Sequence, residues 1–223
     1  MINNIFKFLF AIMLVTSTMP AVVYIYELDT EFSGGTDPVG PSPWAFASFQ
    51  QVDPNTVQLE LSNFNLTGSE FVGAWYLNFN DSLNVNNLNF NRVGGTAVAD
   101  ASISTGINAF KADGDGFFDI LLDFPQKKAD RFGAGDNIIY EITGVNLINP
   151  EMFNFGSAPG GGNGTWYSAA HVQGIGPDAE ASGWIGSGPG VPVPEPTTYL
   201  MLAAMLGIGF LLTRKSRKLV EKK

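Results

Sequence analysis

Apolar and polar residues alternate strictly in Val57-Gln58-Leu59-Glu60-Leu61-Ser62. In an extended chain, this alternation puts the valine and both leucines on one face and the polar side chains on the other. Such a pattern is typical of a β-strand with one buried face. The same period of two recurs at residues 75–79 and 118–124. These stretches predict half-buried strands.

Turn signals separate the predicted strands. Residues that favour tight turns cluster at Asp53-Pro54-Asn55, Asn80-Asp81-Ser82 and Gly133-Ala134-Gly135-Asp136. Between residues 22 and 186, no stretch sustains the helical spacing of three and four residues. We therefore predict an all-β fold, an antiparallel β-sandwich or jelly-roll-like domain over residues 22–186. Further predicted strands are 23–28, 83–85, 88–90, 138–143, 166–175 and 183–185.

The composition excludes several classes of protein. Of the 223 residues, 15% are charged and 45% are apolar, which argues against a disordered acidic chain. Residues 22–196 hold five basic and 20 acidic side chains, a formal charge of −15 that repels nucleic-acid phosphates. The chain has no cysteine, so disulfides, zinc–thiolate sites, iron–sulfur clusters and a cysteine nucleophile are excluded.

The N-terminus has the three parts of a secretory signal. Lys7 precedes an uncharged apolar run over residues 8–15, and small or polar residues follow up to Ala21. This order predicts a signal peptide over residues 1–21, cleaved near Ala21. The alternative is an uncleaved membrane anchor, because residues 8–26 carry no charge.

The C-terminus has the pattern of a membrane-spanning helix. Residues 196–213 are uncharged, and at about 1.5 Å per residue such a run is close to the thickness of the hydrocarbon core. We predict a transmembrane helix over residues 197–213 and a basic cytoplasmic tail over residues 214–223. The cluster that fixes this orientation is Arg214, Lys215, Arg217 and Lys218. The central domain then lies outside the cytoplasm.

A Gly- and Pro-rich linker is predicted between the domain and the helix, over residues 187–196. Proline holds the chain extended and ends a helix. The linker therefore presents Pro194-Glu195-Pro196 at the outer boundary of the membrane, where an enzyme embedded in the bilayer can recognise it.

The end of the chain resembles the PEP-CTERM sorting signal of Gram-negative bacteria. The resemblance lies in the motif Val193, Pro194, Glu195 and Pro196, which the apolar run and the basic cluster follow in order. The resemblance covers residues 191–218. It implies recognition by an exosortase, a membrane-embedded transpeptidase, and cleavage near Pro194 to Pro196. It further implies secretion, an intermediate anchored in the inner membrane, and a final place at the cell surface or in an exopolysaccharide-rich biofilm matrix. The alternative is a single-pass anchor that follows a Pro-rich linker.

An Asp- and Gly-rich stretch has two interpretations. Asp113, Asp115 and Asp119 supply hard oxygen ligands around glycines, as a calcium loop requires. However, the ligand pattern of a complete calcium loop is not present, and Asp-Gly is also among the strongest signals for a hairpin turn. We favour the turn, and calcium remains the alternative.

Aromatic residues raise the question of sugar binding. Trp166 and Tyr167 follow the Gly-rich stretch 157–164, which is predicted to be a flexible loop, and they are the candidate sugar contacts. His171, the only histidine, is predicted to be an ordinary strand residue.

These features predict a non-enzymatic exported protein with a structural or adhesive role and no cofactor. The first alternative is a surface carbohydrate-binding module, stabilised by calcium. The second is a hydrolase that uses paired carboxylates. Asp119 and Asp123, about 13 Å apart along one strand, are too far apart for a glycosidase pair, but carboxylates on different strands leave that alternative open.

Overall fold

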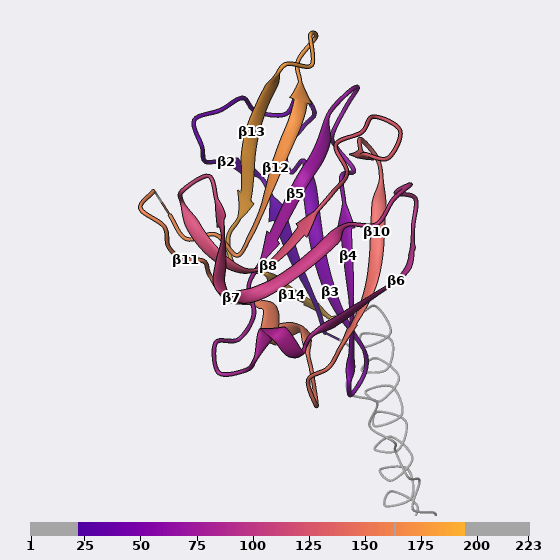
Figure 1. The fold of residues 1–223 in the computed structure, drawn as a ribbon, viewed down its shortest axis with the longest axis vertical. Helices are drawn as coiled ribbons and strands as arrows, with labels where there is room; N and C mark the ends of the chain where they lie inside the picture. Colours follow the sequence, from indigo (N-terminus) through magenta and orange to yellow (C-terminus); the bar gives the residue numbers. More distant parts are fainter. Residues whose placement is uncertain (1–21, 163, 195–223) are drawn as a thin grey trace, which may run out of the picture.

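The computed structural model describes residues 22–162 and 164–194, which form two antiparallel sheets (Figure 1). Sheet 1 has the strand order β14 (Val191–Pro194), β1 (Val22–Leu28), β3 (Ala45–Asp53), β4 (Thr56–Ser62), β10 (Asn137–Thr143) and β6 (Asn89–Gly95). Each neighbouring pair in this order is antiparallel.

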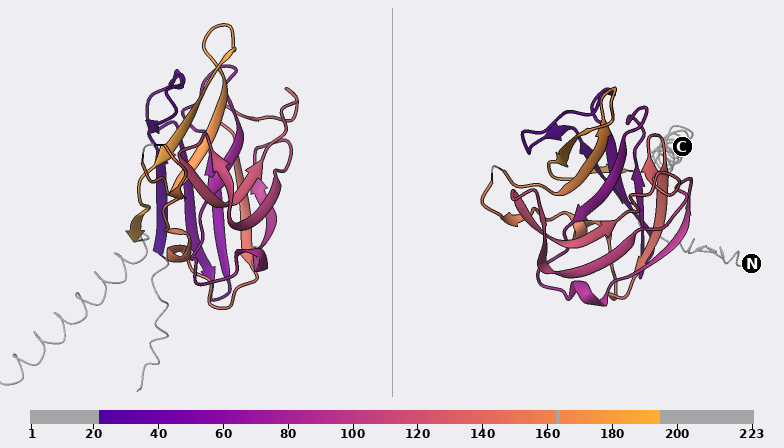
Figure 2. Two further views of the ribbon diagram at one scale, coloured as in Figure 1. Left: turned by 60° about the vertical axis from the view of Figure 1, so that its left-hand side comes forward. Right: turned by 45° about the horizontal axis from the view of Figure 1, so that its top comes forward.

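Sheet 2 has the strand order β11 (Ala158–Pro159), β8 (Gly116–Asp123), β5 (Phe71–Leu77), β12 (Ser168–Ile175), β13 (Ala181–Ser187) and β2 (Thr30–Glu31). In addition, β7 (Ser102–Ala112) pairs with β8, and β9 (Phe132–Gly133) pairs with β5. Figure 2 shows that β7 and β8 curve strongly. Short 3-10 helices, η1 (Val85–Asn87) and η2 (Pro150–Phe153), lie in the connections.

Buried side chains from both sheets form one main core. Phe49 of β3 stacks on Phe153 of η2 with ring centroids 4.3 Å apart, so η2 is held against sheet 1. Trp75 of β5 is fully buried, and its indole N–H donates to the Ser168 hydroxyl of β12 at 2.8 Å. Burial of these large rings provides much of the hydrophobic stabilisation of the domain.

The all-β class predicted from the alternation is confirmed. In β4, Val57, Leu59 and Leu61 are fully buried, and in β8 Ile120 and Leu122 are fully buried on the core side. The sequence pattern therefore identified which face of these strands is buried.

Other local predictions were less accurate. The strand predicted at residues 83–85 is wrong, because the Asn84 side chain accepts a hydrogen bond from the Asn86 N–H and caps η1. Strands β3 and β7 were not predicted. In β7 the reason is physical: its residues are mostly exposed or half-buried and a bulge interrupts them, so no clean alternation appears.

The first and last described strands lie side by side. Strand β14 pairs with β1 from Val22↔Pro194 to Ile25↔Val191, and it adds an edge strand to sheet 1. These four residues fall inside the segment predicted as a linker. Because proline has no N–H, only Val191 and Val193 of β14 can donate to β1, and proline is tolerated in a strand only at such an edge.

The predicted signal peptide (1–21), transmembrane helix (197–213) and basic tail (214–223) lie outside the described residues. Within residues 22–162 and 164–194, no helix is long and apolar enough to cross a membrane.

Candidate functional site

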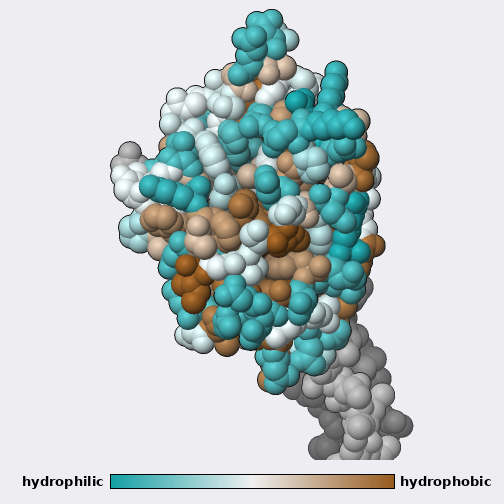
Figure 3. Space-filling model, viewed as in Figure 1, coloured by the Kyte–Doolittle hydropathy of each residue, from teal (hydrophilic) through white to brown (hydrophobic). Residues whose placement is uncertain are grey.

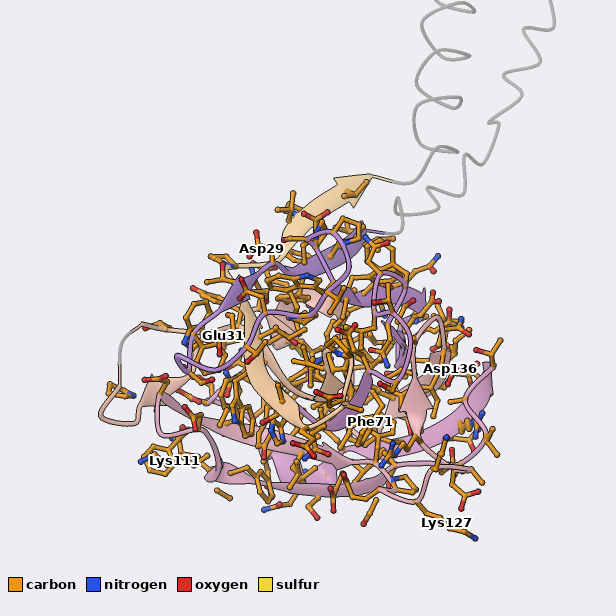
Figure 4. The ribbon with its side chains drawn as sticks, turned by 90° about the horizontal axis from the view of Figure 1, so that it is seen from above. Asp29, Glu31, Phe71, Lys111, Lys127 and Asp136 are labelled. Carbon is orange, nitrogen blue, oxygen red and sulfur yellow. The ribbon has the colours of Figure 1, made fainter. Side chains whose placement is uncertain are left out.

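The Asp-Gly sequence forms the tight turn between β7 and β8. Asp113 and Gly114 have φ angles of 47° and 104°, and the Asp115 N–H donates to the Ala112 carbonyl at 2.9 Å. Positive φ at both central residues defines the hairpin turn that Asp-Gly favours. The turn interpretation of this sequence is therefore confirmed, and Figure 4 shows Lys111 beside it at the rim of the domain.

Asp119 is buried, and it holds a bulge in β7. Its Oδ1 accepts a hydrogen bond from the Asn108 N–H at 2.7 Å, and its Oδ2 accepts one from the Phe79 N–H at 3.1 Å. Asn108 has a φ of 49° and lies where the β7–β8 register shifts, between Thr105 and Phe110. The carboxylate thus ties the bulge and the segment after β5 to strand β8.

The structure does not bring the three predicted calcium ligands together. Both carboxylate oxygens of Asp119 face backbone N–H groups, whereas Asp113 lies in the hairpin turn. In the part of the chain that the structure describes, no group of three or more Asp, Glu, His and Cys side chains could hold a metal ion.

The Gly-rich loop packs against this hairpin. Strand β11 pairs with the start of β8, and a Cβ at Gly160 would lie 2.7 Å from the Gly114 carbonyl oxygen. A Cβ at Gly162 would overlap Oδ1 of Asp115, which is itself buried. The glycines of this loop, predicted to provide flexibility, therefore allow the loop backbone to approach the β7–β8 turn closely.

Trp166 and Tyr167, the predicted sugar contacts, pack into different clusters. Trp166 stacks on Phe32 with ring centroids 4.7 Å apart, and its indole Nε1 is buried without a hydrogen-bond partner among the described residues. Tyr167 packs instead against the main core. The two neighbouring rings therefore do not form a joint platform for a sugar.

A second aromatic surface lies on the face of sheet 2 opposite the main core. His171 of β12 stands directly across from Trp184 of β13, and their rings stack with centroids 4.5 Å apart and an interplanar angle of 12°. Tyr76 of β5 approaches Trp184 at 5.4 Å, and the Gln173 amide lies 3.4 Å from Nδ1 of His171. We call Tyr76, His171, Gln173 and Trp184 the aromatic face.

The aromatic face is partly open to solvent. His171, Gln173 and Trp184 are half-buried, whereas Tyr76 is buried. Figure 3 shows hydrophobic residues gathered across the middle of the molecular face on which β7 and β8 lie in front, and this patch is distinct from the aromatic face, whose four residues have low hydropathy. The sequence alone did not reveal the aromatic face, because the register that places His171 opposite Trp184 is set by pairing between strands.

The groups of the aromatic face are neutral at pH 7. Burial lowers the pKa of His171, and the negative charge of Asp113 opposes this shift only in part. Burial also raises the pKa of Tyr76, and the charge of Asp123 raises it further. A surface of flat rings with a neutral imidazole, a phenol and an amide suits a ligand that combines apolar faces with hydroxyl groups.

The sorting motif begins inside the folded domain. Its first residues, Val193 and Pro194, belong to β14, and Val193 pairs with Val23 of β1. The other motif residues, Glu195 and Pro196, and the basic cluster of Arg214, Lys215, Arg217 and Lys218 lie outside the described residues. The pairing of the motif with β1 could not be anticipated from the sequence, where about 170 residues separate the two strands.

The comparison with protein families places a known motif at this end of the chain. The family model of the PEP-CTERM protein-sorting motif matches residues 192–218, which confirms the resemblance seen in the sequence. No curated protein and no solved structure matches the chain. The motif implies an exported protein that an exosortase processes at the membrane.

Proposed function

We propose that this carrier of a PEP-CTERM motif is a non-enzymatic structural or adhesive component of the cell surface or extracellular matrix. In this proposal a signal peptide directs secretion, and residues 197–213 hold a sandwich-like ectodomain at the membrane until an exosortase acts. The observation that carries the proposal is the motif at residues 192–218, which begins within the last strand of a folded β domain.

The structural roles of Asp119 and Asp113 support the part of the proposal that assigns no calcium site to these two residues. Asp119 is engaged by two backbone N–H groups, and Asp113 forms the hairpin turn. Both residues therefore have structural roles that account for their presence. The Arg92–Asp100 ion pair, at 3.3 Å, likewise links neighbouring parts of the chain.

Intact mass spectrometry of the protein recovered from the host surface tests this proposal. We expect a chain that begins near Val22 and ends near Pro194 to Pro196, because both end segments are removed during export and sorting. Recovery of the complete 223-residue chain from the cytosolic fraction would contradict the proposal.

A second candidate function, carbohydrate binding, is favoured by the stacked and partly exposed pair of His171 and Trp184. Sugars present apolar C–H faces that cover aromatic rings, while neutral amide and imidazole groups bond hydroxyls. The binding residues would then be those of the aromatic face rather than Trp166 and Tyr167.

Trp184→Ala is expected to weaken binding to the exopolysaccharide fraction of the host matrix by about tenfold, the equivalent of about 1.4 kcal/mol. Affinity electrophoresis through a gel that contains this fraction measures the change as a loss of retardation. Phe64→Ala, which removes an exposed aromatic ring outside the aromatic face, is the matched control. Equal migration of wild-type protein with and without the polysaccharide would reject the candidate.

A further inference from the structure

Strand β14 is joined to the domain by a tightly fitted glycine. The Gly190 N–H donates to Oδ1 of Asn154 at 2.9 Å, immediately before β14 begins. Gly190 is buried, and a Cβ at this position would lie 2.5 Å from Cζ of Tyr26. The backbone of Gly190 therefore lies flat against the tyrosine ring, with no room for a side chain.

The ring under Gly190 cannot easily move. Tyr26 is 1% exposed and packs edge-on against Phe49 at 5.7 Å. Phe49 in turn stacks on Phe153 of η2, and Asn154 is the residue that ends this short helix. The site that receives Gly190 is thus built from the main core, and substitution of the glycine must displace either the ring or the strand.

Few residues separate the folded domain from the predicted membrane segment. Strand β14 ends at Pro194, and only Glu195 and Pro196 separate it from the segment predicted to enter the membrane at residue 197. Two residues span at most about 7 Å, so entry into the membrane at residue 197, as the sequence predicts, would place β14 close to the lipid surface. Detachment of the four residues of β14 adds about 13 Å of extended chain.

Pairing with β1 also occupies the main-chain N–H groups through which an enzyme would bind β14. Enzymes and recognition domains commonly hold an extended peptide through its main-chain groups. In β14 the Val191 and Val193 N–H groups face β1, and the two prolines have no N–H to offer on the other edge. While β14 is paired, no main-chain donor of Val191–Pro194 is accessible to an enzyme.

We propose that β14 is a latch on the sorting reaction: Gly190, Tyr26 and Asn154 seat the strand, and the exosortase processes the motif only after β14 detaches from β1. These are positioning residues, because they act on the motif through the strand that carries it. The inference rests on the proposed sorting function and adds a control that the folded domain exerts on it.

A disulfide between the two strands tests the latch. Ile25 and Val191 are direct antiparallel partners, whose Cα separation of about 5 Å suits a disulfide, and the chain has no other cysteine. In the double variant Ile25→Cys/Val191→Cys, we expect the rate of processing, measured by pulse–chase labelling in the native host, to fall by about tenfold or more. The rate should fall because it is proportional to the fraction of molecules in which β14 is detached. A reductant should restore the rate, and the single-cysteine variants are the controls. Processing of the disulfide-linked form at the single-cysteine rate would overturn the latch.

Gly190→Ala tests the latch in the opposite direction. The added methyl group displaces β14, so we expect faster processing and faster cleavage of residues 187–194 by an added protease. Gly188→Ala is the matched control, because a Cβ there meets nothing within 4 Å. The melting temperatures of both variants show whether the domain itself stays folded when β14 detaches. Unchanged or slower processing of Gly190→Ala would contradict the proposal.

Failure of the latch and failure of the sorting function give different results. If Glu195→Ala blocks processing while the disulfide has no effect, only the latch is wrong. If Glu195→Ala is processed normally, the sorting function itself is wrong.

Discussion

Glu195→Ala is expected to leave the protein unprocessed and retained in the membrane of its native host. Glu195 is the only charged residue of the motif, and the stretch that follows it from Pro196 to Thr213 carries no charge. A membrane-embedded enzyme that recognises Pro-Glu-Pro can use this carboxylate for charge-assisted hydrogen bonds, which are about twice as strong as neutral ones. Its removal should therefore abolish recognition while the β domain stays folded.

The measurement for Glu195→Ala is the ratio of precursor to processed form after fractionation of the host. Glu180→Ala is a matched control, since Glu180 is an exposed glutamate in the turn between β12 and β13. The control should be processed like the wild type. A processed fraction of Glu195→Ala equal to that of the wild type would show that the motif is not read through its acidic residue.

Asp119→Ala is expected to destabilise the domain by about 3 kcal/mol, because it leaves two backbone N–H groups, one buried and one part-buried, without an acceptor. The N–H groups are those of Asn108 and Phe79, and Asp119 is only 4% exposed. For a domain of this size, such a loss corresponds to a fall in melting temperature of roughly 10 °C. The bulge of β7 should open first, because Asn108 has a left-handed backbone conformation that the carboxylate stabilises.

The control for Asp119→Ala is Asp123→Ala, on the same strand but exposed, which should change the melting temperature little. Melting temperatures measured with added calcium distinguish a structural role of Asp119 from a role as a metal ligand. We expect millimolar calcium to leave the melting temperatures of wild type and Asp119→Ala unchanged. A rise for the wild type that is lost in Asp119→Ala would instead support calcium binding by this residue.

Features that depend only on residues close together in the sequence could be predicted. The alternation in 57–62 and 118–124 gave the buried faces of β4 and β8, and Asp113-Gly114 gave a hairpin turn. The sorting motif was readable for the same reason, since an enzyme recognises it as a linear segment.

Features that depend on pairing between distant strands could not be predicted. Asp119 was a candidate ligand in the sequence, but its role depends on Phe79, 40 residues away. Trp166 and Tyr167 were selected because they follow a Gly-rich stretch, yet neighbouring residues in an extended chain direct their side chains to opposite faces. His171 and Trp184 were not selected, because only the β12–β13 register brings them together.

The prolines of β14 have a further consequence wherever copies of this protein come close together. An exposed sheet edge is a template on which another molecule can add a strand, and such additions lead to fibrils. Pro192 and Pro194 give this edge no N–H groups, so a second copy that approaches β14 meets only carbonyl oxygens. The strand that carries the sorting motif thereby disfavours the addition of a second molecule at the β14 edge of sheet 1.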